Sequence, residues 1–73
     1  MRLFDLLMNM DGDTMVSIQK NETDDESMFN IKKAHEFELG EVRGWKVVTF
    51  YPERYNAGYC LGITVIVKEE NHV

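Results

Sequence analysis

The first ten residues repeat apolar side chains at the spacing of an α-helix. Four of them fall three or four positions apart and so share one helix face: Leu3, Leu6, Leu7 and Met10. We therefore expect a helix over residues 2–10 that buries this face. A helix this short is marginal in water by itself, so it must pack against other elements to persist.

Residues 14–20 alternate apolar and polar positions, which is typical of a strand with one buried face. The alternation separates two faces, the buried one with Val16 and Ile18 and the other with Met15, Ser17 and Gln19. The sequence Asp-Gly-Asp at 11–13 lies between the helix and this strand. Glycine accepts positive φ and aspartate side chains bond nearby backbone N–H groups, so we expect a turn there.

Two further strands follow in the second half of the chain. Residues 45–51 are rich in β-branched and aromatic side chains, and they are followed by Pro52, which lacks the N–H that a ladder needs. We expect the strand to end there, with a hairpin loop over residues 52–58. Alternation assigns its side chains to two faces, Trp45, Val47, Thr49 and Tyr51 on one and Lys46, Val48 and Phe50 on the other.

Residues 59–67 have the most regular strand pattern of the chain. One face carries Tyr59, Leu61, Ile63, Val65 and Val67, and the other carries Cys60, Thr64 and Ile66. Because both faces are partly apolar, we expect a central strand or a strand whose second face is covered. The residues after it, 68–73, are mostly polar and predict a frayed tail.

The middle of the chain is less regular. Residues 21–26 contain no apolar side chain and predict an exposed hairpin tip. Residues 27–31 predict a second strand, and two pairs of side chains suit its inward face, Met28 with Ile31 or Phe29 with Ile31. For residues 32–44 we expect a short strand followed by a loop or one helical turn, since two glycines interrupt the apolar positions.

These elements predict one α+β domain over residues 1–73, with a short N-terminal helix packed on a four-stranded, mainly antiparallel sheet. A chain of 73 residues buries only about 60% of its unfolded surface, so the core is thin. Domains of this size usually need a disulfide, a metal or a partner subunit. The single cysteine excludes an internal disulfide and fits a reducing compartment, so we expect a cytoplasmic homo-oligomer.

The charge balance bears on the choice of partner. Thirteen acidic and eight basic residues give a net charge of −5, which opposes direct binding to nucleic acid through its phosphates. An acidic chain is instead attracted to basic protein surfaces. The sequence shows no signal-peptide pattern and no apolar run near the roughly 18 residues that span a membrane, so we expect no membrane association.

Candidate chemistry is sparse along this chain. A calcium loop of the EF-hand type needs oxygen ligands at alternating positions. Asp11 and Asp13 would supply the first two, but Met15 occupies the position of the third oxygen ligand. Zinc takes N and S ligands in close pairs, and the candidates here are scattered: His35, Cys60 and His72. Cys60 as a nucleophile with His35 as its base lacks a local oxyanion loop. We expect no catalytic residue, no metal and no cofactor.

Two groups of side chains suit contact with a protein. The first is an acidic cluster of Glu22, Asp24, Asp25 and Glu26, and the second is an aromatic rim of Trp45, Tyr51, Arg54 and Tyr55. Tyrosine, tryptophan and arginine are the residue types that dominate interface energetics. The alternative for the first group is a solvated hairpin tip, and for the second it is side chains that fill a thin core.

The sequence "LFDLLMNMDGDTMVSI" resembles the opening of a loose group of small proteins from phages and mobile elements of Gram-positive bacteria. "WKVVTF", followed by a strand with Leu61, Ile63 and Val65, resembles the end of the same proteins. The resemblance covers roughly forty positions of short apolar motifs, and "NIKKAHEFELGEV" in the middle lacks the proline common in that group. It implies a bacterial host cell and an accessory role, such as interference with host defence or regulation of a host protein.

The leading hypothesis is therefore a non-catalytic protein that binds a host protein with a basic surface, as a mobile-element accessory factor or as an inhibitor. The runner-up is an oligomer that captures a small ligand, such as a nucleotide signal, between its subunits. Arg43, Arg54 and Tyr55 are the cations and the ring that suit such a ligand. The third hypothesis is a structural subunit with no independent activity.

Overall fold

The computed structural model describes residues 1–20, 28–55 and 60–70, with the backbone alone at Tyr55 and Cys60. In chain order the described elements are α1 (Leu3–Asn9), β1 (Met15–Gln19), β2 (Lys32–Lys33), the 3-10 turn η1 (Ala34–Glu36), α2 (Leu39–Val42), β3 (Trp45–Tyr55) and β4 (Cys60–Glu69). The predicted α+β class is confirmed, because a short N-terminal helix packs on a four-stranded sheet.

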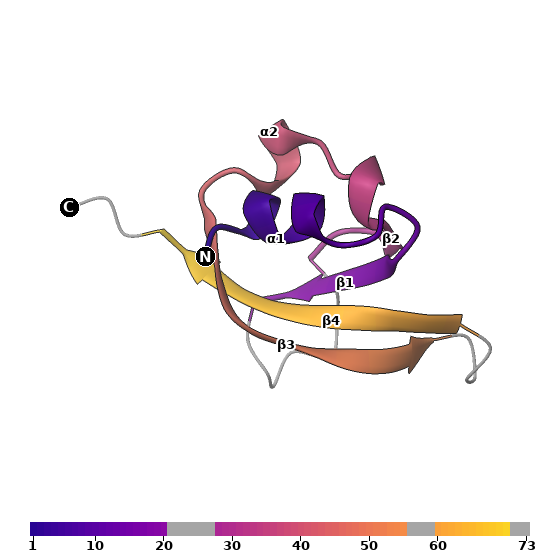
Figure 1. Ribbon diagram of the computed structural model, residues 1–73. Coiled ribbons are helices and arrows are strands. Elements are labelled where there is room, and N and C mark those ends of the chain that lie inside the picture. The colour runs from indigo at the N-terminus through magenta and orange to yellow at the C-terminus, as the bar shows by residue number, and fades with distance from the viewer. Residues whose placement is uncertain (21–27, 56–59, 71–73) are drawn as a thin grey trace.

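The sheet is mixed, with the strand order β2-β1-β4-β3 (Figure 1). β3 and β4 form an antiparallel hairpin, and β1 is antiparallel to β2. β1 is parallel to β4, with Val16 beside Ile63 and Ile18 beside Val65. β4 is therefore a central strand, as its two apolar faces predict, whereas the parallel pair was not predicted. A parallel pair needs a long crossover, and the chain between β1 and β4 supplies it.

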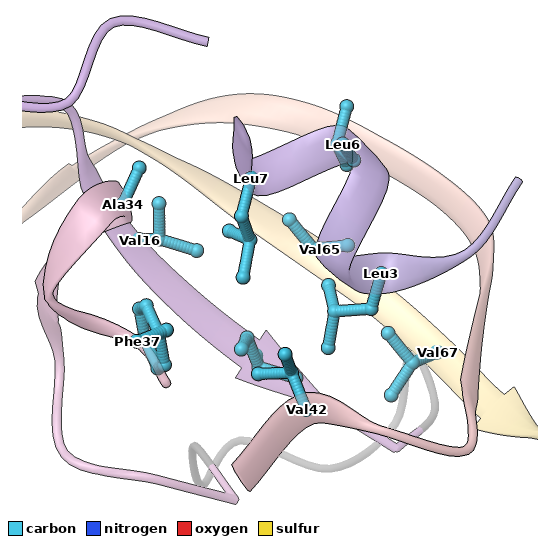
Figure 2. Packing of buried hydrophobic residues seen from close by; sticks show 10 residues of the cluster. Leu3, Leu6, Leu7, Val16, Ala34, Phe37, Val42, Val65 and Val67 are labelled. Carbon is cyan, nitrogen blue, oxygen red and sulfur yellow. The ribbon is translucent and has the colours of Figure 1, made fainter. Parts of the chain in front are cut away.

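The helical segments that the structure describes cover the same face of the sheet. α1, η1 and α2 lie on one side of the strands in Figure 1. Figure 2 shows Leu3 and Leu7 of α1 directed toward the valines of β1 and β4. Ten buried residues form this core: Leu3, Leu6, Leu7, Val16, Ile18, Ala34, Phe37, Val42, Val65 and Val67. Each buried aliphatic side chain contributes about 1.5–3 kcal/mol, so this single layer holds the fold together.

The corner between α1 and β1 is a side-chain-supported turn. Asp11 Oδ1 accepts a hydrogen bond from the backbone N of Asp13 at 2.9 Å, and Thr14 N donates to Asp11 O at 3.0 Å. Asp11 thus caps its own turn, which is the local bonding that makes aspartate a turn former. Asp13 in turn lies 3.5 Å from the Lys33 ammonium. The predicted turn is confirmed.

The predicted second strand over residues 27–31 is wrong, because the strand in this region is β2 and spans only Lys32–Lys33. Met28 N donates to Ile18 O at 2.6 Å, and Phe29 meets Phe37 edge to face with ring centroids 6.2 Å apart. These two side chains are half-buried against the core without a continuous ladder. Ile31, expected inward in both alternatives, is 43% exposed. The weak alternation of this segment reflects packing by an irregular backbone.

β3 differs from its prediction in two ways. It continues through Pro52 to Tyr55, because it is an edge strand, where a residue without an N–H is tolerated. A register shift between Val47 and Thr49 also inserts one residue into the strand. Val47 pairs with Val67 on the helix side, but Thr49 and Tyr51 pair on the opposite face, so the predicted division of faces is wrong beyond Val47. Local alternation cannot show such an insertion.

β4 continues beyond its predicted end. Lys68 and Glu69 belong to β4, and Glu70 N donates to Gly44 O at 2.9 Å, so a frayed tail beginning at residue 68 is wrong. Residues 71–73 and the predicted hairpin tip at 21–26 lie outside the described residues. Within the described part of the chain, no helix has the length and apolar character needed to cross a membrane.

Candidate binding surfaces at the two ends of β3

β3 carries a different surface at each of its ends. Trp45 begins the strand and Arg54 lies near its end. At about 3.4 Å per residue, these two positions are on the order of 30 Å apart. The aromatic rim named from the sequence is therefore not one cluster: Trp45 is separated from Tyr51 and Arg54, and the side chain of Tyr55 lies outside the described residues.

The far end of the β3–β4 hairpin presents a partly exposed apolar surface. Register pairs place five side chains on the face that the helices cover elsewhere: Phe50, Pro52, Arg54, Leu61 and Ile63. We call these five residues the hairpin arm surface. In Figure 1 this end of the hairpin extends past the helical layer. Accordingly Phe50 is 49% exposed and Leu61 is 68% exposed, although their neighbour Val65 is fully buried.

The opposite face of the hairpin has a side-chain hydrogen bond across the two strands. Thr64 is fully buried, and its hydroxyl donates to a carboxylate oxygen of Glu53. Tyr51 pairs with Thr64 on this face and is 38% exposed. Tyr51 therefore points away from the hairpin arm surface, because successive side chains alternate across a strand.

The outer edge of β3 carries two features that discourage pairing with another strand. The bulge at Val47–Thr49 breaks the regular ladder, and Pro52 offers no N–H to a neighbour. The start of the strand is already paired with the N-terminal segment. Val47 N donates a hydrogen bond to Met1 O at 2.8 Å, and the backbones of Arg2 and Lys46 form an isolated antiparallel β-bridge. Contact with a partner is therefore favoured on a face of the hairpin over its edge.

At the other end of β3 lies a cleft of about 380 Å³, which we call the Trp45 cleft. Its lining comes from both chain ends, from α2 and from the turn into β3: Arg2, Phe4, Leu39, Val42, Arg43, Gly44, Trp45 and Glu70. Val42 is buried at its base, and Trp45 and Phe4 pack partly against the core. The cleft thus has apolar residues that pack on the core and charged residues in the rest of its lining.

The charged side chains of the Trp45 cleft differ in their exposure and in their ion pairing. Arg2 Nε lies 3.4 Å from Glu70 Oε1, and the arginine side chain is 75% exposed while the glutamate is 19% exposed. Arg43 is exposed and makes no ion pair with any residue that the structure describes. Arg43 was named from the sequence as a ligand candidate, but nothing indicated that Arg2 or Glu70 would join it. Their meeting depends on backbone pairing between segments far apart in the chain, which leaves no local pattern.

Some polar groups elsewhere have partners within the fold. The Lys32 ammonium lies 2.8 Å from Glu41 Oε2 and 4.8 Å from the centre of the Phe37 ring, which fixes α2 against β2. His35 is exposed and its backbone N donates to Gly12 O at 3.3 Å. Over the described residues there is no group of three or more His, Cys, Asp and Glu side chains that suits a metal ion. His72 and the Cys60 side chain lie outside that part of the chain, as do Glu22, Asp24, Asp25 and Glu26.

No protein-family model, no curated protein and no solved structure matches this chain. Its function must therefore be inferred from the two surfaces at the ends of β3.

Proposed function

We propose that this chain is a non-catalytic accessory protein that binds a protein of a bacterial host through the hairpin arm surface. The observation that carries the proposal is the exposure of Phe50 and Leu61 on the same face of the hairpin, at 49% and 68%. Exposing such side chains forgoes about 1.5–3 kcal/mol each relative to burial. A contiguous apolar surface of this kind is typical of a protein interface.

The chemistry of the hairpin arm surface supports a protein partner. An aromatic ring, two aliphatic side chains and a proline form its apolar part, and the exposed Arg54 stands beside Leu61 at the rim. Aromatic and arginine side chains are enriched at interface centres. The strands beneath them are held by the ladder of the hairpin, so little conformational entropy is lost when a partner docks.

Electrostatics and the family resemblance suggest which partner to seek. The net charge of −5 favours a protein with a basic surface, because it accelerates encounter with positive patches. The resemblance to accessory proteins of phages and mobile elements suggests a host defence or regulatory protein, which this chain would inhibit by covering its surface. Asp11, Lys32 and Thr64 bond to other groups within the fold, and this supports the proposed non-catalytic role.

Site-specific photocrosslinking in a host extract tests the proposal. A photoreactive residue at position 61 lies on the hairpin arm surface, and one at the exposed position 68 lies at the far end of the same strand. We expect a discrete adduct with one host protein from position 61 and none from position 68. An adduct of two copies of this chain at position 61 would contradict a host partner and assign the surface to self-association.

Matched variants then measure the contact with the purified partner. Leu61→Ser should weaken binding at least about tenfold, as interface hot spots do. Leu39→Ser is the control, since Leu39 is also exposed, at 49%, but lines the Trp45 cleft instead. Equal loss of affinity in both variants would show that the hairpin arm surface is not the contact.

A further inference from the structure

The Trp45 cleft is a second candidate site, independent of the hairpin arm surface because it lies at the opposite end of β3. Its volume of about 380 Å³ falls in the range of small-molecule pockets. Three backbone hydrogen bonds hold the walls of the cleft. In the first, Glu70 N donates to Gly44 O at 2.9 Å, and in the second, Val47 N donates to Met1 O at 2.8 Å. The third, from Arg43 N to Leu39 O at 2.9 Å, closes α2. The walls are therefore preformed.

The apolar wall of the cleft suits a planar ring. Trp45 is half-buried, packs against the core and lines the cleft. Phe4 lies in the same wall and is also half-buried. Aromatic side chains held in this way provide stacking surfaces, and such stacking contributes about 1–3 kcal/mol for a nucleobase.

The charged opening suits an anion. Two arginines and one glutamate line it, so its local charge is 2 − 1 = +1, in a chain whose net charge is −5. Glu70 is already paired with Arg2 through Nε, and a guanidinium carries five N–H donors, so donors remain for a second acceptor. Arg43 faces the same cleft without an ion pair in the described part of the chain. Arginine forks match phosphate and carboxylate oxygens.

We propose that the Trp45 cleft binds a small planar anion of the nucleoside monophosphate class, with its ring against Trp45 and its phosphate between Arg43 and Arg2. A ring without a phosphate would contact only the apolar wall, and a phosphate without a ring would contact only the two arginines. Only a ligand with both uses the whole lining. The site is complete within one copy of this chain, and it does not depend on the host partner proposed above.

Intrinsic fluorescence tests this site directly, because Trp45 is the only tryptophan of the sequence. Adenosine monophosphate is titrated into the full chain, with excitation at a wavelength that nucleotides do not absorb. We expect saturable quenching below about 5 mM nucleotide, corresponding to a weak but specific site. Adenosine and inorganic phosphate, each titrated alone, should bind at least about tenfold more weakly.

Two matched variants separate local contact from general charge. Arg43→Gln should weaken nucleotide binding about tenfold, whereas Lys33→Gln, with the same change of charge at an exposed residue outside the cleft, should alter it less than about twofold. Absence of saturable quenching would overturn the proposal. Equal binding of adenosine, or equal effects of the two variants, would also overturn it, because the arginine would then not contact the phosphate. None of these results depends on the hairpin arm surface.

Discussion

Gly12 lies against the imidazole of His35 so closely that a Cβ on Gly12 would stand 2.5 Å from Nδ1 and 2.9 Å from Cγ. The two residues are also joined by the hydrogen bond from His35 N to Gly12 O, at 3.3 Å. This contact docks the turn after α1 onto η1. Gly12→Ala should therefore destabilise the fold by about 1–3 kcal/mol, since the new methyl group would displace the whole imidazole ring of His35. Urea unfolding measures the change.

The control for this prediction is removal of the ring. His35 is exposed, so His35→Ala alone should change stability by less than about 0.5 kcal/mol. The double variant should recover most of the loss seen in Gly12→Ala, because the clash is gone. An additive result in this cycle would show that the steric contact is not the cause.

The two glycines around α2 should respond oppositely to alanine. Gly44 has φ of +84° at the turn into β3, where a Cβ costs about 1–2 kcal/mol. Gly40 lies within α2 with open space around it, so alanine there should stabilise the protein by about 0.5–1 kcal/mol. Thermal unfolding of both variants compares them. A similar fall in Tm for both would contradict the special role of the Gly44 backbone.

Neighbouring residues of α1 should differ sharply when truncated. Leu7 is fully buried beneath the helix, and Leu7→Ala should cost about 2–5 kcal/mol because it leaves a cavity in a single-layer core. Met8 is 38% exposed, and Met8→Ala should cost less than about 0.5 kcal/mol. Chemical denaturation at equal protein concentration gives both values. Comparable losses would mean that α1 packs on another face.

Pro52 should limit association through the edge of β3. Pro52→Thr restores an N–H to the edge strand without changing net charge, so we expect self-association to increase with concentration. Sedimentation velocity across a concentration series measures it, with Thr49→Val as a control that adds no donor. Unchanged sedimentation of Pro52→Thr would show that the bulge alone protects this edge. The expectation of a homo-oligomer is tested in the same series with the natural chain.

The candidate site was only partly accessible from the sequence. Trp45, Arg43 and Arg54 were singled out because their residue types are typical of binding surfaces. The sequence did not show that these residues belong to two distant surfaces, because their separation follows from the length of β3, which continues through Pro52. Arg2 was not anticipated at all, since it reaches the cleft through pairing with β3.

Local spacing by itself determined the helix at Leu3–Asn9, the strand at Met15–Gln19 and the two faces of β4. These features follow from side-chain periodicity, which acts between residues a few positions apart. Tertiary structure alone decided the parallel pairing of β1 with β4, the bulge in β3 and the meeting of Arg2, Arg43 and Glu70 in one cleft. Strand pairing joins backbone groups that are identical in every residue, so the choice of partner depends on the packing of the whole core.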